Sequence, residues 1–143
     1  MRIIGLDIGA RRVGVAASDP DERLAVPLEV IERRGTGDAS RLADLARREQ
    51  AGRIVVGLPV SLDGTLGPQA QEVQAFADEL RAATDAEVVL YDERLSSAEA
   101  DRHLHAAGLR GKAARARRDA VAAAIILQAY LDSRRTAPLP PIE

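Results

Sequence analysis

The order of hydrophobic patterns along the chain constrains this fold more than any other feature of the sequence. Three short strand-like segments, residues 2–8, 12–18 and 24–31, lie close enough together for an antiparallel meander. From residue 38 onward the period changes, and helical segments alternate with strand-like ones. Three strands followed by this alternation predict an α/β fold.

The second part of the chain supplies the helices and two buried strands. We expect these strands to join residues 2–8 as the parallel, helix-covered centre of a mixed five-stranded sheet, with the early meander as its antiparallel edge. Pro27 predicts an edge position or a bulge for the third strand. The predicted helices are 38–50, 68 to at least 80, 96–107 and 113–135, and the predicted strands are 53–58 and 87–91.

Length and composition favour one domain. A chain of 143 residues, 46% of them apolar, can bury a sizeable core. We expect the domain to span residues 1–135 and to be followed by a loose, proline-rich tail over 136–143. The absence of cysteine excludes disulfides, thiolate metal sites and a cysteine nucleophile. No apolar run approaches the roughly 18 residues of a membrane span, so we expect a cytoplasmic protein without a membrane partner.

Charge and aromatic content limit how such a chain could bind nucleic acid. The formal net charge is −2, whereas proteins that coat nucleic acid nonspecifically are usually basic. Aromatic residues make up only 2% of the chain, too few for a platform that stacks single-stranded bases. A local basic patch is available, since residues 102–118 hold six Lys or Arg and no acid. Such a run is equally typical of a solvated face, but it leads directly into Asp119 and suits a polyanion.

Three carboxylates occupy unusual positions. Asp7 lies inside an apolar strand, Glu93 follows the strand 87–91, and Asp119 opens the apolar part of the last helix. Each has an ordinary structural explanation when taken alone. Asp7 could cap the following turn, Glu93 could pair with Arg94, and Asp119 could complement the helix dipole.

Taken together, the three acids indicate a metal site. Asp7 and Glu93 fall at the carboxyl ends of predicted parallel strands, the edge at which open α/β sheets bind ligands. Ala122, Ala123 and Ile126 share the side of Asp119 on its helix, and small residues there would allow a close approach to the sheet. Three acids that meet at one point repel one another unless a cation joins them. All-oxygen ligation suits Mg²⁺ or Mn²⁺.

Ordered sequence blocks extend this interpretation from residue 1 to about residue 132. The blocks are Gly5-Leu6-Asp7-Ile8-Gly9, Arg12-Val13-Gly14-Val15-Ala16, Val56-Gly57-Leu58-Pro59, Asp63-Gly64, Asp92-Glu93-Arg94-Leu95-Ser96-Ser97, Asp119-Ala120-Val121-Ala122-Ala123 and Ile126-Leu127-Gln128. The set resembles the YqgF/RuvX family, which implies a ribonuclease H-like fold related to the RuvC Holliday junction resolvases. The resemblance also implies nuclease activity, at the 5′ end of pre-16S rRNA or on Holliday junctions, and it places Asp7, Glu93 and Asp119 on the family's acidic active-site positions.

The predicted mechanism is metal-assisted hydrolysis of phosphodiester bonds. The three carboxylates would hold two divalent ions about 3.5–4 Å apart, one activating water and the other stabilising the leaving oxygen. Basic side chains would position the backbone of a structured RNA or branched DNA, bound by a monomer or a weak homodimer. These side chains are Arg11, Arg12, Arg94, Arg110, Lys112, Arg115 and Arg118.

The preferred role is 5′-end maturation of pre-16S rRNA, with resolution of Holliday junctions in recombination and repair as the alternative. Two other classes of protein stay open. Sugar kinases and actin-like ATPases also begin with a strand, Asp-x-Gly and a hairpin, but they need two such domains around the nucleotide. A noncatalytic factor in transcription or ribosome assembly would bind RNA or protein independently of Asp7 and of divalent metal.

Overall fold

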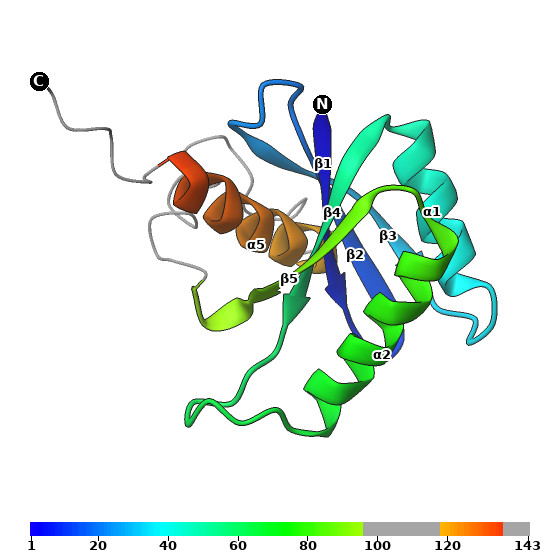
Figure 1. Ribbon diagram of the computed structural model, residues 1–143, viewed down its shortest axis with the longest axis vertical. Coiled ribbons are helices and arrows are strands. Elements are labelled where there is room, and N and C mark those ends of the chain that lie inside the picture. Colours follow the sequence, from blue (N-terminus) through cyan, green and yellow to red (C-terminus); the bar gives the residue numbers. More distant parts are fainter. Residues whose placement is uncertain (96–117, 136–143) are drawn as a thin grey trace, which may run out of the picture.

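Five strands form one mixed sheet in the order β3–β2–β1–β4–β5 (Figure 1). The computed structural model describes residues 1–95 and 118–135. Strands β3, β2 and β1 pair antiparallel, whereas β1, β4 and β5 pair parallel. The elements are β1 (Arg2–Ile8), β2 (Arg12–Ser18), β3 (Ala25–Glu32), α1 (Asp38–Arg48), β4 (Ala51–Leu58), α2 (Pro68–Ala83), β5 (Glu87–Asp92), the 3₁₀ turn η1 (Glu93–Leu95) and α5 (Arg118–Arg135).

The predicted mixed sheet is confirmed, including its antiparallel meander. Strand β3 lies at one edge, and its ladder with β2 shifts register between Val15 and Ala16, opposite Pro27 and Glu29. Both expectations for Pro27, an edge position and a bulge, are therefore met. The parallel set β1, β4 and β5 is also confirmed, but β1 alone is central and β5 forms the other edge.

Helix boundaries agree less closely with the sequence pattern. Helix α1 ends at Arg48, and the chain reverses at Gln50, whose φ of 57° is left-handed. Strand β4 begins at Ala51, two residues before the predicted start at residue 53. Helix α2 begins at Pro68 as predicted, because proline suits a first-turn position. The predicted helix 96–107, the start of the last helix at 113–117 and the tail 136–143 lie outside the described residues. Within the described ranges, none of the helices reaches the length and hydropathy that a bilayer crossing demands.

One face of the sheet packs against α1 and α2 through large aliphatic side chains (Figure 1). In β1, alternate residues Ile4, Leu6 and Ile8 point to this side, because successive strand residues face opposite sides of a sheet. They meet Leu42 and Leu80 of the two helices in the larger of two buried clusters. This cluster supplies most of the hydrophobic core.

The opposite face is covered by α5 and is lined with small residues. Ala16 and Val55 of the sheet pack there against Ala123 and Leu127 of the helix. At Gly5 a β-carbon would lie 2.7 Å from the Leu127 β-carbon and 3.2 Å from a carbonyl oxygen of the helix. The helix therefore lies closer to the sheet than larger side chains would permit, as the small residues of the last helix predicted.

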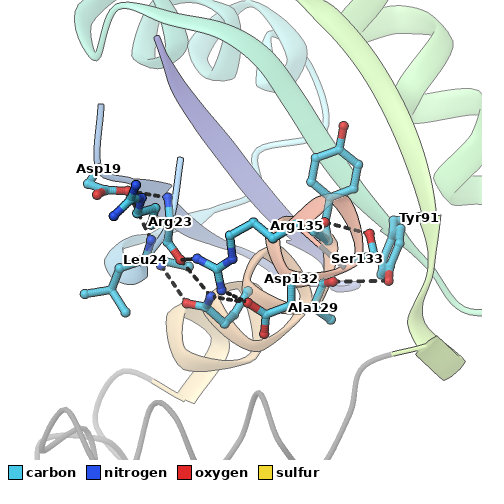
Figure 2. A network of polar contacts seen from close by, with 11 residues as sticks. Asp19, Arg23, Leu24, Tyr91, Ala129, Asp132, Ser133 and Arg135 are labelled. Atoms are coloured by element: carbon cyan, nitrogen blue, oxygen red, sulfur yellow. Dashed lines mark hydrogen bonds and ion pairs between the residues drawn. The ribbon is translucent and has the colours of Figure 1, made fainter. Parts of the chain in front are cut away.

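Polar contacts fix the carboxyl-terminal half of α5 (Figure 2). The buried Gln128 amide accepts a hydrogen bond from the Ala25 N–H at 2.8 Å and donates to the Arg23 carbonyl at 2.9 Å. Arg135 also donates to the Arg23 carbonyl at 2.9 Å and forms an ion pair with Asp132. These bonds satisfy buried polar groups and hold α5 at one position and rotation on the sheet.

Candidate active site

Asp7 faces α5 from the central strand. It belongs to the alternate set Ile3, Gly5 and Asp7, opposite in direction to the aliphatic set of β1. In the antiparallel ladder Asp7 pairs with Gly14 of β2. The turn beyond β1 is closed by a backbone hydrogen bond from the Gly9 N–H to the Arg12 carbonyl, at 2.8 Å. The Asp7 side chain forms a hydrogen bond with Glu93.

Gly14 brings the start of α5 to Asp7. A β-carbon at Gly14 would lie 1.8 Å from the Asp119 carbonyl oxygen and 2.9 Å from the Ala120 nitrogen. The first turn of α5 thus rests on the strand residue that pairs with Asp7. The charge of Asp119 raises the pKa of Asp7, so the two carboxylates lie within electrostatic reach of each other.

Gly57 brings Glu93 to Asp7 from the other side. Glu93 follows β5 in η1, and β4 lies between β5 and β1. A β-carbon at Gly57 of β4 would lie 2.8 Å from Glu93 Oε1 and 2.7 Å from Ile126 Cδ1. The Glu93 side chain therefore crosses β4 over a residue without a side chain and forms a hydrogen bond with Asp7.

Burial and mutual repulsion set the protonation of this pair. Burial is the largest cause that raises the pKa of Glu93 to about 7, followed by the charge of Asp7, the hydrogen bond to Asp7 and the charge of Asp92. Burial also raises the pKa of Asp7, followed by the charge of Asp119, while the hydrogen bond from Glu93 lowers it. The hydrogen bond between them raises the pKa of Glu93 and lowers that of Asp7, so Glu93 is the member of the pair that takes up a proton more readily.

The donor set fits a hard divalent cation, although the side chains are not arranged around one. All three groups offer carboxylate oxygens, and the proton between Asp7 and Glu93 occupies a place that a cation could take. The Asp119 carboxylate is paired with Arg12, whose Nε lies 2.9 Å from Oδ2. Within residues 1–95 and 118–135, no three acidic, His or Cys side chains are grouped closely enough to hold a metal. We expect Arg12 to compete with a metal for the Asp119 carboxylate.

The predicted basic residues fall into three groups. Arg11 and Arg118 are exposed beside the site, and Arg12 is engaged with Asp119. Arg94 does not pair with Glu93. It binds Asp92 through Nη2 at 2.8 Å and Nε at 3.1 Å, and Nη1 donates to the Ser61 carbonyl at 3.2 Å. Arg110, Lys112 and Arg115 lie outside the described residues.

The glycines beneath the carboxylates are the functional positions that sequence reasoning missed. Gly5 also contacts α5, but the groups that form the site lie on Gly14 and Gly57. Glycine is unfavourable inside a strand, so its presence within β2 and β4 was the available signal.

This arrangement of sheet and helices is the fold of RuvC-type Holliday junction resolvases. The structure of Thermus thermophilus RuvC in complex with a Holliday junction substrate matches with a TM-score of 0.60 and 18% identity, covering 95% of this chain and 96% of that one. The fowlpox virus Holliday junction resolvase matches with a TM-score of 0.53 and 14% identity, over 93% and 99% of the two chains. The expected ribonuclease H-like fold is confirmed.

The chain belongs to the RuvX family. The model of that family, described as "Holliday junction resolvase", matches residues 1–133. A relative from Chloroflexus aurantiacus is 45% identical over 137 residues, covering 95% of this chain and 90% of its own. Another, from Roseiflexus sp., is 45% identical over 135 residues, covering 94% and 96%. Both relatives carry the name "Putative pre-16S rRNA nuclease".

Proposed function

We propose that this protein is a divalent-metal-dependent nuclease whose metal ligands are Asp7, Glu93 and Asp119. The observation that carries the proposal is the hydrogen bond between Asp7 of β1 and Glu93 of η1, two carboxyl groups that meet beside the start of α5. A fold gains little stability from bringing two acidic side chains together in a half-buried position, because burial and repulsion disfavour their charged forms. Their convergence is understandable if a cation, Mg²⁺ or Mn²⁺, joins them in the working protein.

The chain and the cation would have separate tasks. When bound, divalent cations supply an activated water and stabilise the leaving oxygen of a phosphodiester. The three carboxylates supply oxygen ligands in a site that α5 and the glycine positions hold in place. Arg11 and Arg118 are exposed beside them and supply positive charge for the phosphates of the substrate, and Arg12 would join them on leaving Asp119.

For the substrate, we propose precursor 16S rRNA, cut during maturation of its 5′ end. The names of the relatives at 42–45% identity support this choice. It also goes with the cytoplasmic location expected from the sequence, where ribosomes assemble. The alternative, a Holliday junction, is favoured by the family description and by the RuvC complex. Symmetric cutting of a junction would require two copies of the chain, whereas rRNA processing is compatible with a monomer.

A cleavage panel tests this proposal. Wild type and Asp7→Asn are compared on precursor rRNA, a four-way DNA junction and single-stranded DNA, each with Mg²⁺, Mn²⁺ or chelator. We expect Asp7→Asn to abolish metal-dependent cleavage while its melting temperature stays equal or rises, because a carboxylate that burial and the charge of Asp119 both disfavour is removed. Asp44→Asn is the matched control, since Asp44 is 67% exposed on α1 and pairs with Arg47 of the same helix.

The panel also separates the alternatives. A folded Asp7→Asn protein that retains Mn²⁺-dependent cleavage would show that the carboxylates are not the site. Wild type that cleaves none of the substrates, yet binds nucleic acid with an affinity unchanged by Asp7→Asn or by chelator, would instead identify a noncatalytic factor. Preference for the junction over the rRNA would select the resolvase function.

A further inference from the structure

Two of the proposed phosphate contacts depend on the tight turn between β1 and β2. Arg11 lies in this turn, and Arg12 directly follows it as the first residue of β2. The turn has little apolar packing, because Gly9 has no side chain and Ala10 and Arg11 are exposed. A groove lies between Ala10 and Phe76 of α2. Polar contacts are therefore needed to hold the turn, and with it the two arginines, in one position.

Arg33, the residue that follows β3, supplies these contacts. Its Nη1 donates to the Gly9 carbonyl at 2.9 Å, and its backbone N–H donates to the Arg11 carbonyl at 2.8 Å. The bond to Gly9 has a charged donor and is therefore stronger than one between neutral groups. Both ends of the turn are thus bonded to a single residue.

The Arg33 guanidinium is itself held by the two helices of the aliphatic face. Its Nε lies 3.6 Å from Oδ2 of Asp38 at the start of α1, and its Cζ lies 5.3 Å from the centre of the Phe76 ring in α2. Asp38 is buried, and Phe76 belongs to the larger hydrophobic cluster. A guanidinium carries enough donors to bind a carboxylate and a carbonyl at once. Arg33 therefore connects the packed helices to the turn at the candidate site.

We propose that Arg33 is a positioning residue of the nuclease, which orients Arg11 and Arg12 for the phosphates of the substrate by fixing the turn between β1 and β2. The inference rests on the proposed function. Arg33 acts through the turn and not as a phosphate ligand, because Asp38, Phe76 and the Gly9 carbonyl already engage its guanidinium. Side chains that are ordered before binding lose less conformational entropy when the substrate binds.

The test compares Arg33→Met with Arg81→Met in the Asp7→Asn background, so that bound nucleic acid stays intact. The probes are a four-way DNA junction and a precursor rRNA 5′-end fragment. Arg81 is the matched control at the far end of α2, because Nη2 donates to the Val88 carbonyl at 3.2 Å and Nη1 pairs with Asp78 at 2.9 Å. We expect Arg33→Met to raise Kd about three- to tenfold, the cost of ordering one or two side chains on binding. Arg81→Met should leave Kd unchanged.

Steady-state cleavage with Asp7 intact gives a second measurement. Arg33→Met should raise KM and leave kcat near that of wild type, because the carboxylates that carry the chemical step stay in place. Amide hydrogen exchange at Gly9 should become faster, since its N–H closes the turn by donating to the Arg12 carbonyl at 2.8 Å. Arg33→Lys keeps a cationic donor and should show smaller changes in the same direction. It replaces Arg33→Met in every comparison if that variant does not fold.

A double-mutant comparison separates positioning from direct contact. Arg33→Met is combined with Arg11→Ala and Arg12→Ala, and Kd is measured with and without the Arg33 substitution. If Arg33 acts through the other two side chains, most of its effect on Kd should disappear, because the effects of coupled residues are not additive. An effect of Arg33→Met that persists undiminished would identify a direct substrate contact and overturn the positioning role.

Other outcomes would also overturn the inference. Equal Kd values with and without Arg33→Met would show that the turn needs no such anchor. A fall in kcat with unchanged KM would place the effect of Arg33 on the carboxylates instead. In either case the proposed function stands if wild type cleaves and Asp7→Asn does not. If wild type neither binds nor cleaves the two probes, the proposed function and this inference fail together.

Discussion

The two faces of the sheet are built on opposite principles. Beneath α1 and α2, interior space is filled by large aliphatic side chains such as Leu6, Val56 and Leu80. Beneath α5 the sheet instead carries Gly5, Gly14 and Gly57, and residues of the helix or Glu93 pack directly against these positions. Large side chains thus pack the two helices onto one face. On the other face, glycines allow a single helix to approach the sheet closely.

Buried acids differ between the two faces in the same way. Asp38 at the start of α1 accepts hydrogen bonds from the Arg34 and Gly35 N–H groups at 2.9 and 3.1 Å, and it pairs with Arg41. Asp7, half-buried on the α5 face, forms a hydrogen bond with Glu93 and is repelled by the charge of Asp119. The first carboxylate is stabilised by its surroundings and the second is not. The buried carboxylate beside the aliphatic face therefore stabilises the folded protein, whereas the carboxylates on the α5 face destabilise it.

Gly14→Ala should have the largest effect. The added methyl group would collide with the backbone of Asp119, which cannot rotate away as a side chain can. We expect a loss of about 1–3 kcal/mol in the free energy of unfolding, together with strongly reduced cleavage because α5 and Asp119 are displaced. Urea unfolding and cleavage of the preferred substrate measure the two effects.

Leu80→Ala, on the aliphatic face, should affect stability without affecting cleavage, unlike Gly14→Ala. We expect it to lower the free energy of unfolding by about 2–5 kcal/mol. The specific cleavage rate should stay near that of wild type at temperatures where the variant is folded. If Gly14→Ala proves as stable and active as wild type, α5 is not held against β2 as described.

Gly57→Ala should separate activity from stability. Its methyl group would meet the ends of two side chains, Glu93 and Ile126, which can move aside at little cost. We expect almost unchanged thermal unfolding but cleavage reduced by about 100-fold, because a displacement of roughly 1 Å in an active site can cost that much. Gly52→Ala is the control in the same strand, since its methyl group would meet only the flexible side chain of Met1. Equal activity in the two variants would argue against a role for Glu93.

Asp38→Asn should show how much the hydrogen bonds to the buried Asp38 carboxylate stabilise the folded protein. Burial alone would raise the pKa of Asp38, but hydrogen bonds from Arg34, Arg41 and Gly35 outweigh burial and lower it. The carboxylate therefore stabilises the fold fully above its unfolded pKa of about 3.9, and this contribution disappears as pH falls through the lower folded pKa. We expect Asp38→Asn to lose about 2 kcal/mol at neutral pH and much less at about pH 3. Urea unfolding at both pH values measures this loss of stability. An equal loss at both would contradict a stabilising role for the ionised Asp38 carboxylate.

Arg12→Ala should have the smallest effect and act on the α5 face alone. Removal of Arg12 frees the Asp119 carboxylate from its ion pair. We expect Mn²⁺ to bind about two- to fivefold more tightly, matching the modest free energy of a partly exposed ion pair. Calorimetric titration with Mn²⁺ tests this, and Arg11→Ala controls for the change in net charge. Equal affinities in the two variants would show that Arg12 does not compete with metal.

Much of the fold could be predicted from the sequence because the relevant signals are local. Strands β1 and β2 occupy the predicted ranges, Pro27 marked the edge and bulge of β3, and Pro68 marked the start of α2. Gln50 shows the limit of this reasoning. Its left-handed φ ends the turn after α1, although glutamine carries no signal for that conformation.

The candidate site could be predicted in its residues but not in its contacts. Asp7 and Glu93 were marked by their positions on apolar strands, and they meet. Charge patterns did not indicate that Arg94 would form an ion pair with Asp92 and not with Glu93, or that Asp119 would form one with Arg12. Such choices depend on differences of a few ångströms between side chains that are far apart in the sequence or adjacent on a turn.

By itself the sequence determined the α/β class, the mixed sheet and the acids available for chemistry. Hydrophobic period reports which residues of each segment are buried, and residue type reports what they can ligate. The tertiary structure alone decided that β1 lies at the centre, that α5 rests on Gly14, and that Glu93 reaches Asp7 across Gly57. Those outcomes depend on how closely one backbone approaches another, a distance that is set only when all the elements pack together.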